Sequence, residues 1–394
     1  MAADPVVIAS YARTPMGGLQ GVFASLKATE LGAAAVRGAV ERAGVAGEAI
    51  DRIYMGCVLP AGLGQAPARQ AALAAGLPRS VQATTLNKMC GSGMQAAILA
   101  WESLTAGAAD VIVAGGMESM TNAPYLLPKH RSGARLGHDR VVDSMLLDGL
   151  EDAYEPGNLM GIYAERIVKE YGFTREEQDA YALESLRRAL AAIESGAFAE
   201  EIVPVEVKTR TGVELVTVDE QPGKAKPENI PKLKPAFVEG GTVTAANASS
   251  ISDGAAALVM TRASVAERLG LPVVARVVAT ACHAHEPGYF TTAPVGATRK
   301  VLAKAGWEVG DVDLFEVNEA FAVVAMIAMR DLGIPHEKLN VHGGACALGH
   351  PIGASGARIV ATLLNALRRR DLKRGVAAIC LGGGEATAMA FERI

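Results

Sequence analysis

The sequence predicts an α/β fold with two similar halves and a loop domain inserted into the first half. Apolar residues make up 50% of the 394 residues, aromatic residues only 5%, and glycine occurs 43 times. This balance favours layered α/β packing, in which Val, Ile and Ala fill strands and helices and Gly forms tight turns. Expected strands and helices alternate near both ends of the chain, whereas prolines interrupt the middle. The length also suggests about two or three domains.

The first alternating stretch, residues 1–119, is the expected N-terminal half. Its expected elements are, in order, a strand at Val6–Tyr11, a helix at Thr29–Ala43, a strand at Asp51–Val58, a helix at Pro67–Ala75, a strand at Val81–Met89, a helix at Ser92–Thr105 and a strand at Val111–Ala114. Regular alternation of strand and helix is typical of a mainly parallel sheet with helices on its faces. We therefore expect such a sheet.

Residues 120–245 are interpreted as an inserted loop domain because the alternation stops there. Two long expected helices lie among the prolines Pro124, Pro128, Pro156, Pro204, Pro222, Pro227, Pro231 and Pro235. The second helix opens with Thr174-Arg-Glu-Glu177, a capping box whose Thr and Glu satisfy free N–H groups of the first turn. The segment 129–140 is locally basic, and it fits a solvated loop as well as a phosphate or subunit contact.

Alternation resumes after this insertion. Residues 246–270 are expected to complete the first half and residues 271–394 to form the second. The expected strands are Ala255–Met260, Val273–Cys282, Leu314–Val317 and Ala377–Leu381, and the expected helices are Gly296–Ala305, Ala320–Leu332 and Ser355–Arg369. Each half has Ser-Gly at a helix start, at Ser92 and at Ser355, and a glycine-rich turn after the next strand. A duplicated fold explains this similarity between the two halves.

Charge and hydropathy exclude several classes of partner. Lys and Arg number 38 against 42 Asp and Glu, which gives a formal net charge of −4. No global basic field therefore exists to hold nucleic acid or an anionic membrane. The start of the sequence lacks the positive charge of a signal peptide, and the longest uncharged apolar run, Ala320–Met329, is far short of a membrane span. We expect neither a nucleic-acid partner nor membrane insertion.

The cysteines favour a reducing compartment. The five cysteines, Cys57, Cys90, Cys282, Cys346 and Cys380, form no CxxC pair and are odd in number. A disulfide scaffold is therefore not expected, and the cytoplasm is the expected location.

Cys90 is the first candidate catalytic residue. It lies in Asn87-Lys-Met-Cys-Gly-Ser-Gly-Met94, between an expected strand and an expected helix. The free N–H groups and positive dipole of a helix start stabilise a thiolate, so we expect the pKa of this thiol to be lowered toward neutrality. The same residues allow an alternative, because Gly91-x-Gly93-x-x-Ala96 with Glu118 loosely fits a dinucleotide fingerprint. A nicotinamide-dependent oxidoreductase is therefore the runner-up.

A second group of candidates lies in residues 342–358. His342, Cys346 and His350 are spaced by four, which on a helix would align three metal ligands. The helix is implausible because Gly343, Gly344, Gly349 and Pro351 interrupt it, and no metal site is expected. His350, in a Gly-His-Pro-Ile-Gly loop before a helix, instead suits a general base.

Cys380 and Asn318 complete the set of candidates. Cys380 ends a strand before Gly382-Gly-Gly384, where backbone N–H groups are able to form an oxyanion hole. Asn318 also follows a strand and precedes a helix. Because ligands of open α/β sheets bind at the carboxyl ends of strands, we expect these groups to face a shared cleft.

Six motifs in this order resemble those of the thiolase family, in particular its acetyl-CoA C-acetyltransferases, over essentially the whole chain. They are Asn87-Lys-Met-Cys-Gly-Ser-Gly-Met94, Ala114-Gly-Gly-Met-Glu-Ser-Met120, Gly240-Gly-Thr-Val-Thr-Ala-Ala-Asn-Ala-Ser249, Asn318-Glu-Ala-Phe321, Gly349-His-Pro-Ile-Gly-Ala-Ser-Gly-Ala-Arg358 and Cys380-Leu-Gly-Gly-Gly384. The resemblance implies a five-layered αβαβα fold. It also implies reversible ping-pong condensation of two acetyl-CoA to acetoacetyl-CoA and CoA, or thiolysis of a 3-ketoacyl-CoA, in fatty acid metabolism.

The resemblance also implies residue roles. Cys90 would be the acylated nucleophile, His350 would remove its proton, and Cys380 would be the second acid/base. His350 with a water held by Asn318 would form one oxyanion hole, and the N–H groups of Cys90 and Gly382 the other. The positions matching the family's CoA contacts are Met160, Phe237, Ala245, Ser249, Ala320 and Phe321.

Assembly and cofactor use are also implied by the resemblance. The resemblance implies a dimer or a tetramer, with a homotetramer (a dimer of dimers) expected, in which the segment 129–140 would join the dimers; the sequence leaves the choice between dimer and tetramer open. CoA would be a cosubstrate, and no other cofactor is expected.

Two positions depart from the family pattern. Leu159 precedes Met160 where many biosynthetic members have His, and Glu385-Ala-Thr follows Gly384 where relatives have Met-Gly or Gln-Gly. Neither changes the four reactive residues, so the sequence leaves acyl chain length and physiological direction open. Besides the oxidoreductase using Gly91 and Gly93, a catalytically silent acyl-CoA binding protein stays as an alternative.

Overall fold

A computed structural model describes residues 4–394. Its strands are β1 Val6–Arg13, β2 Gly17–Gly18, β3 Arg52–Gly56, β4 Gln82–Leu86, β5 Val111–Ser119, β6 Tyr125–Leu126, β7 Val142–Asp143, β8 Val205–Thr209, β9 Gly212–Val216, β10 Ser252–Arg262, β11 Ala275–Ala284, β12 Leu314–Val317, β13 Arg374–Leu381 and β14 Glu385–Arg393. Its helices are α1 Ala28–Ala43, α2 Pro67–Ala74, α3 Ser92–Thr105, α4 Met160–Tyr171, α5 Arg175–Glu194, α6 Glu220–Lys224, α7 Ala263–Leu269, α8 Ala293–Ala305, α9 Ala322–Leu332, α10 Ala345–Leu348 and α11 Ser355–Arg369. In this described part of the chain, no helix is both long and apolar enough to cross a membrane.

The large sheet is mixed, so the expectation of a mainly parallel sheet is wrong. Its strand order is β12-β13-β14-β11-β1-β10-β5-β3-β4. Along this path, within residues 4–394, only β3–β4, β3–β5 and β12–β13 pair in parallel. The remaining neighbours are antiparallel because β10 returns between β1 and β5, and because a tight turn at residues 382–384 folds β14 back on β13. Strand β14 was not predicted from the sequence.

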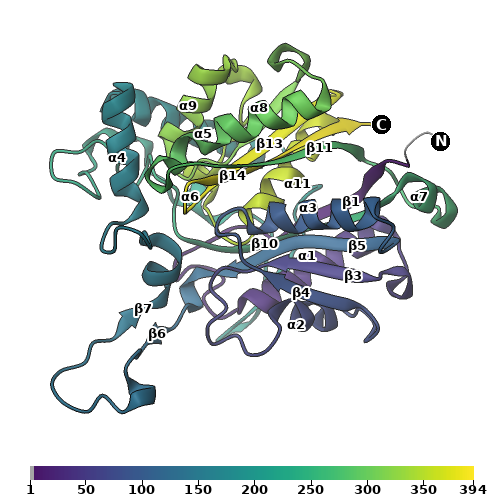
Figure 1. Cartoon of the computed structure of the whole chain (residues 1–394), viewed down its shortest axis with the longest axis horizontal. Coiled ribbons are helices and arrows are strands. Elements are labelled where there is room, and N and C mark those ends of the chain that lie inside the picture. Colours follow the sequence, from purple (N-terminus) through teal and green to yellow (C-terminus); the bar gives the residue numbers. More distant parts are fainter. Residues whose placement is uncertain (1–3) are drawn as a thin grey trace.

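The chain forms two halves with the same succession of elements. In the first, β1, α1, β3, α3, β5 and β10 follow one another, and in the second β11, α8, β12, α11, β13 and β14 do. Helices α3 and α11 share one core cluster with strands of both halves, while α1 and α2 cover one outer face and α8 and α9 the other. Figure 1 shows this succession of helix and strand layers. The duplicated, five-layered α/β fold is therefore confirmed.

The two central helices approach each other closely at their first turns. A Cβ on Gly356 of α11 would lie 2.4 Å from the Met94 backbone nitrogen, and a Cβ on Gly93 of α3 would lie 2.8 Å from the Ala357 nitrogen. Only glycine leaves room for this backbone contact. Because Cys90 and His350 lie just before these helices, the contact brings their two loops together.

The stretch that follows β5 is tied to the first half through Arg13. This guanidinium is fully buried and contacts Glu201 at 2.5 Å and Asp219 at 2.7 Å. The predicted capping box of α5 is confirmed, since Thr174 Oγ1 accepts from Glu177 N at 3.1 Å and Glu177 Oε2 accepts from Thr174 N at 2.7 Å. The hairpin β6–β7 carries the basic segment 129–140 on an arm that projects from the molecule (Figure 1). The proposed domain boundaries stay a prediction.

Substitution of Gly356 tests the central contact. We expect Gly356→Ala to lower the free energy of unfolding by about 1–3 kcal/mol because the added methyl meets backbone that cannot move aside freely. Urea unfolding followed by circular dichroism measures this loss. Gly310→Ala is the matched control, because a Cβ there meets nothing within 4 Å, and it should change the value by less than about 0.5 kcal/mol. Equal losses of stability in Gly356→Ala and Gly310→Ala would contradict a close backbone contact at Gly356.

Candidate active site

Cys90 lies in a strained turn between β4 and α3. Met89, just before it, has a positive φ of 47°, which is uncommon for a residue with a side chain. The Gly91 N–H donates to the Lys88 carbonyl at 3.1 Å. A Cβ on Gly91 would lie 2.6 Å from Leu381 Cδ2, so the turn presses against the end of β13. The predicted position of Cys90 at the start of α3 is confirmed.

The expected lowering of the pKa of Cys90 is wrong. Burial raises the pKa of this thiol to about 12, although the backbone N–H groups of Gly382 and Cys90 itself oppose the shift. Burial raises the pKa of Cys90 more than the N-terminus of α3 lowers it, because desolvation penalises the charged thiolate. Cys90 is therefore a thiol at neutral pH in the ligand-free protein, and a base must take its proton during attack.

His350 is held rigidly between α10 and α11. Its backbone N–H lies 3.1 Å from the Ser250 carbonyl and 3.2 Å from Ser252 Oγ. Its Nδ1 lies 2.6 Å from Ser355 Oγ, at the start of α11. Burial, with a smaller contribution from the Arg358 charge, lowers the pKa of His350 to about 3. The imidazole is therefore neutral at physiological pH and able to accept a proton.

Asn318 and Cys380 come from neighbouring strand ends. The Asn318 N–H, just after β12, donates to the Ala378 carbonyl of β13 at 3.0 Å. Its side-chain Nδ2 lies 3.5 Å from both imidazole nitrogens of His350. Cys380 is fully buried in β13, and its burial together with the nearby Cys90 raises the pKa of its thiol.

These contacts connect the five predicted catalytic residues into one region. Cys90, Cys380 and the Gly382 N–H interact on one side, and Asn318 with His350 forms the other. Ile352, in the His350 loop, shares a small apolar cluster with Cys90. The arrangement offers two thiols, a neutral imidazole and several N–H donors, which is what acyl transfer requires.

The predicted CoA contacts divide into two places. Met160, Phe237, Ala320 and Phe321 belong to or pack against the core cluster that also contains Cys380, and the rings of Phe237 and Phe321 are 6.0 Å apart between centroids. The Ser249 N–H donates to the Ala320 carbonyl at 3.0 Å.

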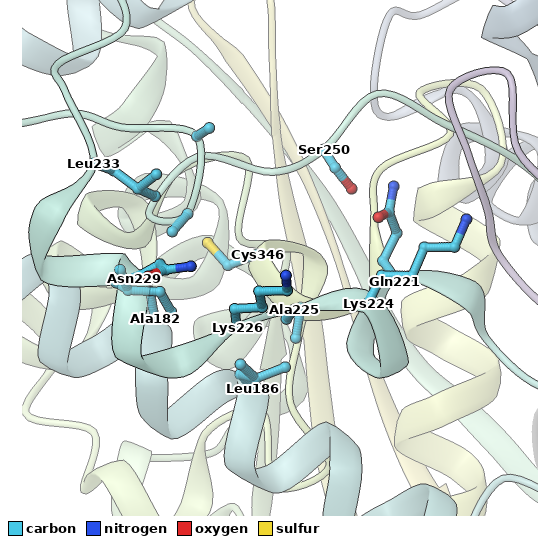
Figure 2. Close-up of a pocket in the computed structure, with 14 residues that line it drawn as sticks. Ala182, Leu186, Gln221, Lys224, Ala225, Lys226, Asn229, Leu233, Ser250 and Cys346 are labelled. Atoms are coloured by element: carbon cyan, nitrogen blue, oxygen red, sulfur yellow. The ribbon is translucent and has the colours of Figure 1, made fainter.

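Ala245 instead lines a cavity of about 340 Å³ next to this group. Figure 2 shows how side chains of α5, of the segment following β9 and of helix α10, which carries Cys346, surround it. The polar or charged side chains of its lining are Gln221, Lys224, Lys226, Asn229, Ser250 and Cys346.

The two departures from the family pattern lie beside the site. Leu159 is the extended residue that precedes α4. Glu385, the first residue of β14, contacts Lys88 Nζ at 2.5 Å. This ion pair joins the Cys90 turn to β14.

Glu118 is a buried residue that the sequence indicated only as part of a dinucleotide fingerprint and of a family motif. Its carboxylate accepts from the N–H groups of Val58 at 2.9 Å, Leu59 at 3.2 Å and Gly353 at 2.9 Å. Burial raises the pKa of Glu118 to about 7. The side chain thus joins the loop after β3 to the His350 loop. An acidic residue two positions after Gly116, within the apolar strand β5, is the sequence signal that could have found it.

Glu319, which follows Asn318, joins the site to the inserted region. Its carboxylate accepts from Tyr181 Oη at 2.9 Å, Ser185 Oγ at 2.7 Å and Asn340 Nδ2 at 2.9 Å. Tyr181 and Ser185 belong to α5. Helix α5 therefore fixes the backbone next to Asn318.

The three residues weighed as metal ligands have different surroundings. His342 packs edge-on against Phe198, the Cys346 thiol points to the Asn247 carbonyl at 3.7 Å, and His350 contacts Ser355. Among residues 4–394, no group of three potential ligand side chains could hold a metal ion.

Comparison with known proteins places the chain in a family. The model of the thiolase N-terminal domain matches residues 6–264 and that of the thiolase C-terminal domain matches residues 271–393. The chain belongs to the thiolase family. Acetyl-CoA acetyltransferase of Pseudomonas aeruginosa is 50% identical over 390 residues, which cover 98% of this chain and 99% of that protein. Acetyl-CoA acetyltransferase 2 of Arabidopsis thaliana is 52% identical, covering 98% and 96%.

Solved thiolases share the fold of this one. The acetyl-CoA acetyltransferase of Bacillus anthracis superposes with a TM-score of 0.97 at 40% identity, covering 100% of both chains. A thiolase from Ascaris suum in complex with coenzyme A gives a TM-score of 0.93 at 42% identity, covering 99% of this chain and 100% of that one.

The oxidoreductase alternative gains no support. In this thiolase the Glu118 carboxylate accepts three backbone N–H groups in the core, so it is not available for a ribose hydroxyl. Gly93, a glycine of the proposed fingerprint, packs against the Ala357 backbone instead.

Alkylation of Cys90 tests its pKa. Only the thiolate reacts with iodoacetamide. At every pH well below the pKa of about 12, the thiolate fraction of Cys90 rises about tenfold for each unit by which the pH increases. The alkylation rate should therefore rise about tenfold per unit from pH 7 to 9. Peptide mapping after timed quenching measures the rate at Cys90 separately from the exposed Cys282. A rate that levels off below pH 8 would show a resting thiolate and contradict the raised pKa of Cys90.

Proposed function

We propose that this thiolase is an acetyl-CoA C-acetyltransferase, which condenses two acetyl-CoA to acetoacetyl-CoA and CoA and catalyses the reverse thiolysis of 3-ketoacyl-CoA. The observation that carries the proposal is the convergence of Cys90, Cys380, His350 and Asn318 from four different segments on one region. The naming of both relatives above supports the substrate class.

The first half-reaction transfers an acetyl group to Cys90. As the sulfur attacks the thioester carbon, its proton passes to the neutral imidazole of His350. The N–H groups of Cys90 and Gly382 stabilise the tetrahedral oxyanion, and each such donor contributes about 3 kcal/mol. The carbon–sulfur bond to CoA then breaks, and the CoA sulfur takes the proton of Cys380, which leaves Cys380 as a thiolate and His350 protonated.

The second half-reaction forms the carbon–carbon bond. Cys380, as a thiolate, removes a proton from the methyl carbon of the second acetyl-CoA. Because its surroundings raise the pKa of Cys380, this thiolate is a strong base. The enolate attacks the acetyl carbon on Cys90, and the bond from that carbon to the Cys90 sulfur breaks. The proton held by His350 passes to the Cys90 sulfur, and Cys380 keeps the proton taken from the methyl carbon, so all three groups return to their uncharged starting forms.

CoA is expected to lie along the groups that match the family's contacts. The apolar wall of Met160, Phe237 and Phe321 suits the pantetheine chain. The cavity beside Ala245 carries Lys224 and Lys226, whose charges suit the phosphates of CoA. Lys224 also forms an ion pair with Glu220, whose negative charge offsets part of the local positive charge. The CoA complex of the Ascaris suum thiolase supports CoA binding by this fold.

We propose a homotetramer in which the arm on β6–β7 joins two dimers. Leu136, between β6 and β7, is 99% exposed, and Tyr125 in β6 and Val141 just before β7 are 67% and 61% exposed. Exposed apolar side chains on a projecting hairpin are typical of a contact with another chain.

The proposed chemistry favours a reducing compartment, the cytoplasm. Both catalytic thiols lose their function when oxidised. The reaction needs no metal or organic cofactor besides the cosubstrate CoA.

Mass spectrometry tests the ping-pong step. Brief exposure to acetyl-CoA alone should add one acetyl group to the Cys90 peptide, and free CoA should remove it. Cys90→Ser should abolish this adduct.

Cys380→Ser should still be acetylated but should lose condensation and thiolysis by about 10²–10⁴-fold. Near-normal turnover of Cys380→Ser would refute its role as base. A protein that binds acetyl-CoA and longer acyl-CoAs without any adduct would be the catalytically silent alternative.

A charged substitution on the arm tests whether the arm joins two dimers. Leu136→Glu should convert tetramers to dimers because the introduced carboxylate cannot be buried unpaired. Size-exclusion chromatography with light scattering measures the mass. Val213→Glu is the control, since Val213 is a 63% exposed apolar residue on another hairpin. Unchanged tetramers in Leu136→Glu would exclude this arm contact.

A further inference from the structure

Arg358 lies fully buried in the first turns of α11, next to the His350–Asn318 pair. Its Nη2 is 3.4 Å from Asn318 Oδ1, and its Nη1 is 3.9 Å from Glu316 Oε2. Its Nε and Nη1 have no hydrogen-bond partner among the described residues. A buried guanidinium with so few partners is costly, so its retention beside the site calls for a reason.

We propose that Arg358 is a positioning residue that orients the Asn318 side chain, so that this amide presents its N–H donors to the active site. This inference rests on the proposed function, because it concerns the oxyanion hole that Asn318 and His350 would form in the condensation step.

The direction of the Asn318 amide follows from hydrogen-bond chemistry. A guanidinium has only donors, so the amide atom that faces Arg358 must be the oxygen. The amide nitrogen then lies on the opposite side, 3.5 Å from both nitrogens of His350. Arg358 therefore selects one of the two flipped orientations of the Asn318 amide, which have nearly the same shape.

This orientation determines how well a bound water stabilises an enolate. A water that accepts a hydrogen bond from Asn318 Nδ2 keeps both of its own hydrogens free to donate. With the amide reversed, the water would give one hydrogen to Oδ1 and keep only one. An enolate oxygen is stabilised by donors aimed at it, so the orientation set by Arg358 favours the condensation step.

The placement of Arg358 on α11 supports the same role. Ser355, three residues earlier, contacts Nδ1 of His350 at 2.6 Å, and residues three apart lie on one face of a helix. One helical face thus holds the imidazole through Ser355 and the amide through Arg358. The positive charge also contributes to keeping His350 neutral.

Two partial reactions separate positioning from a structural role. The first is acetylation of Cys90 by acetyl-CoA, measured by quenched mass spectrometry. The second is exchange of the acetyl methyl protons for deuterium in D2O, measured by NMR, which requires the enolate. Both are measured for the wild type, Arg358→Lys, Arg358→Met and Glu316→Gln, together with thermal unfolding. Glu316→Gln is the matched control, because it removes the same ion pair and leaves the contact between Arg358 and Asn318.

Both Arg358 variants should slow methyl exchange by about 10- to 100-fold, the usual effect of a misplaced oxyanion donor, and acetylation by less than about threefold. Glu316→Gln should keep both rates within about threefold, the scatter expected when no catalytic contact is removed.

Three results would overturn the inference: equal losses in both reactions, equal losses in Glu316→Gln, or the failure of both Arg358 variants to fold, which would make Arg358 a structural residue. A wild type without acetylation would instead refute the proposed function.

Discussion

The backbone contact between the first turns of α3 and α11 is the constraint on which the site depends. Gly93 and Gly356 allow two helix starts to meet at a distance that no side chain permits. Each helix is preceded by a loop that carries one reactive group, Cys90 in the first half and His350 in the second. The duplication of the fold therefore creates the site, since neither half contains both groups. Glu118 reinforces the junction because it joins a first-half loop to Gly353.

Enclosure by protein sets the acid–base properties of the reactive groups. It raises the pKa of Cys90 and of Cys380 and lowers that of His350. All three shifts favour the uncharged form, as desolvation requires. Charge then develops only during the reaction, where backbone N–H groups and the Asn318 amide are already placed to receive it. Such preorganisation gives electrostatic stabilisation without reorganisation of solvent.

The sequence predicted most of the fold because its signals are local. Helix α3 and strand β12 have the predicted bounds, since glycine turns and apolar runs delimit them. The strand directions were missed because they depend on partners far apart in the chain, as when β10 inserts between β1 and β5. The location of Cys90 was predictable from its turn, but its pKa was not, because the pKa depends on enclosure by both halves. The hydrogen bonds of Glu118 and Arg358 likewise involve segments that no local pattern relates.

The buried ion pairs of Arg13 have a consequence for folding during synthesis. Arg13 lies in β1, and its bidentate partner Asp219 is 206 residues further along. A buried guanidinium without its carboxylates is strongly unfavourable, so β1 cannot settle in its final place until that part of the chain exists. At a synthesis rate of about 5–20 residues per second, this interval is about 10–40 s. Strand β10, the neighbour of β1, ends later still, at Arg262. The emerging chain therefore needs protection of its first strand from aggregation during that time.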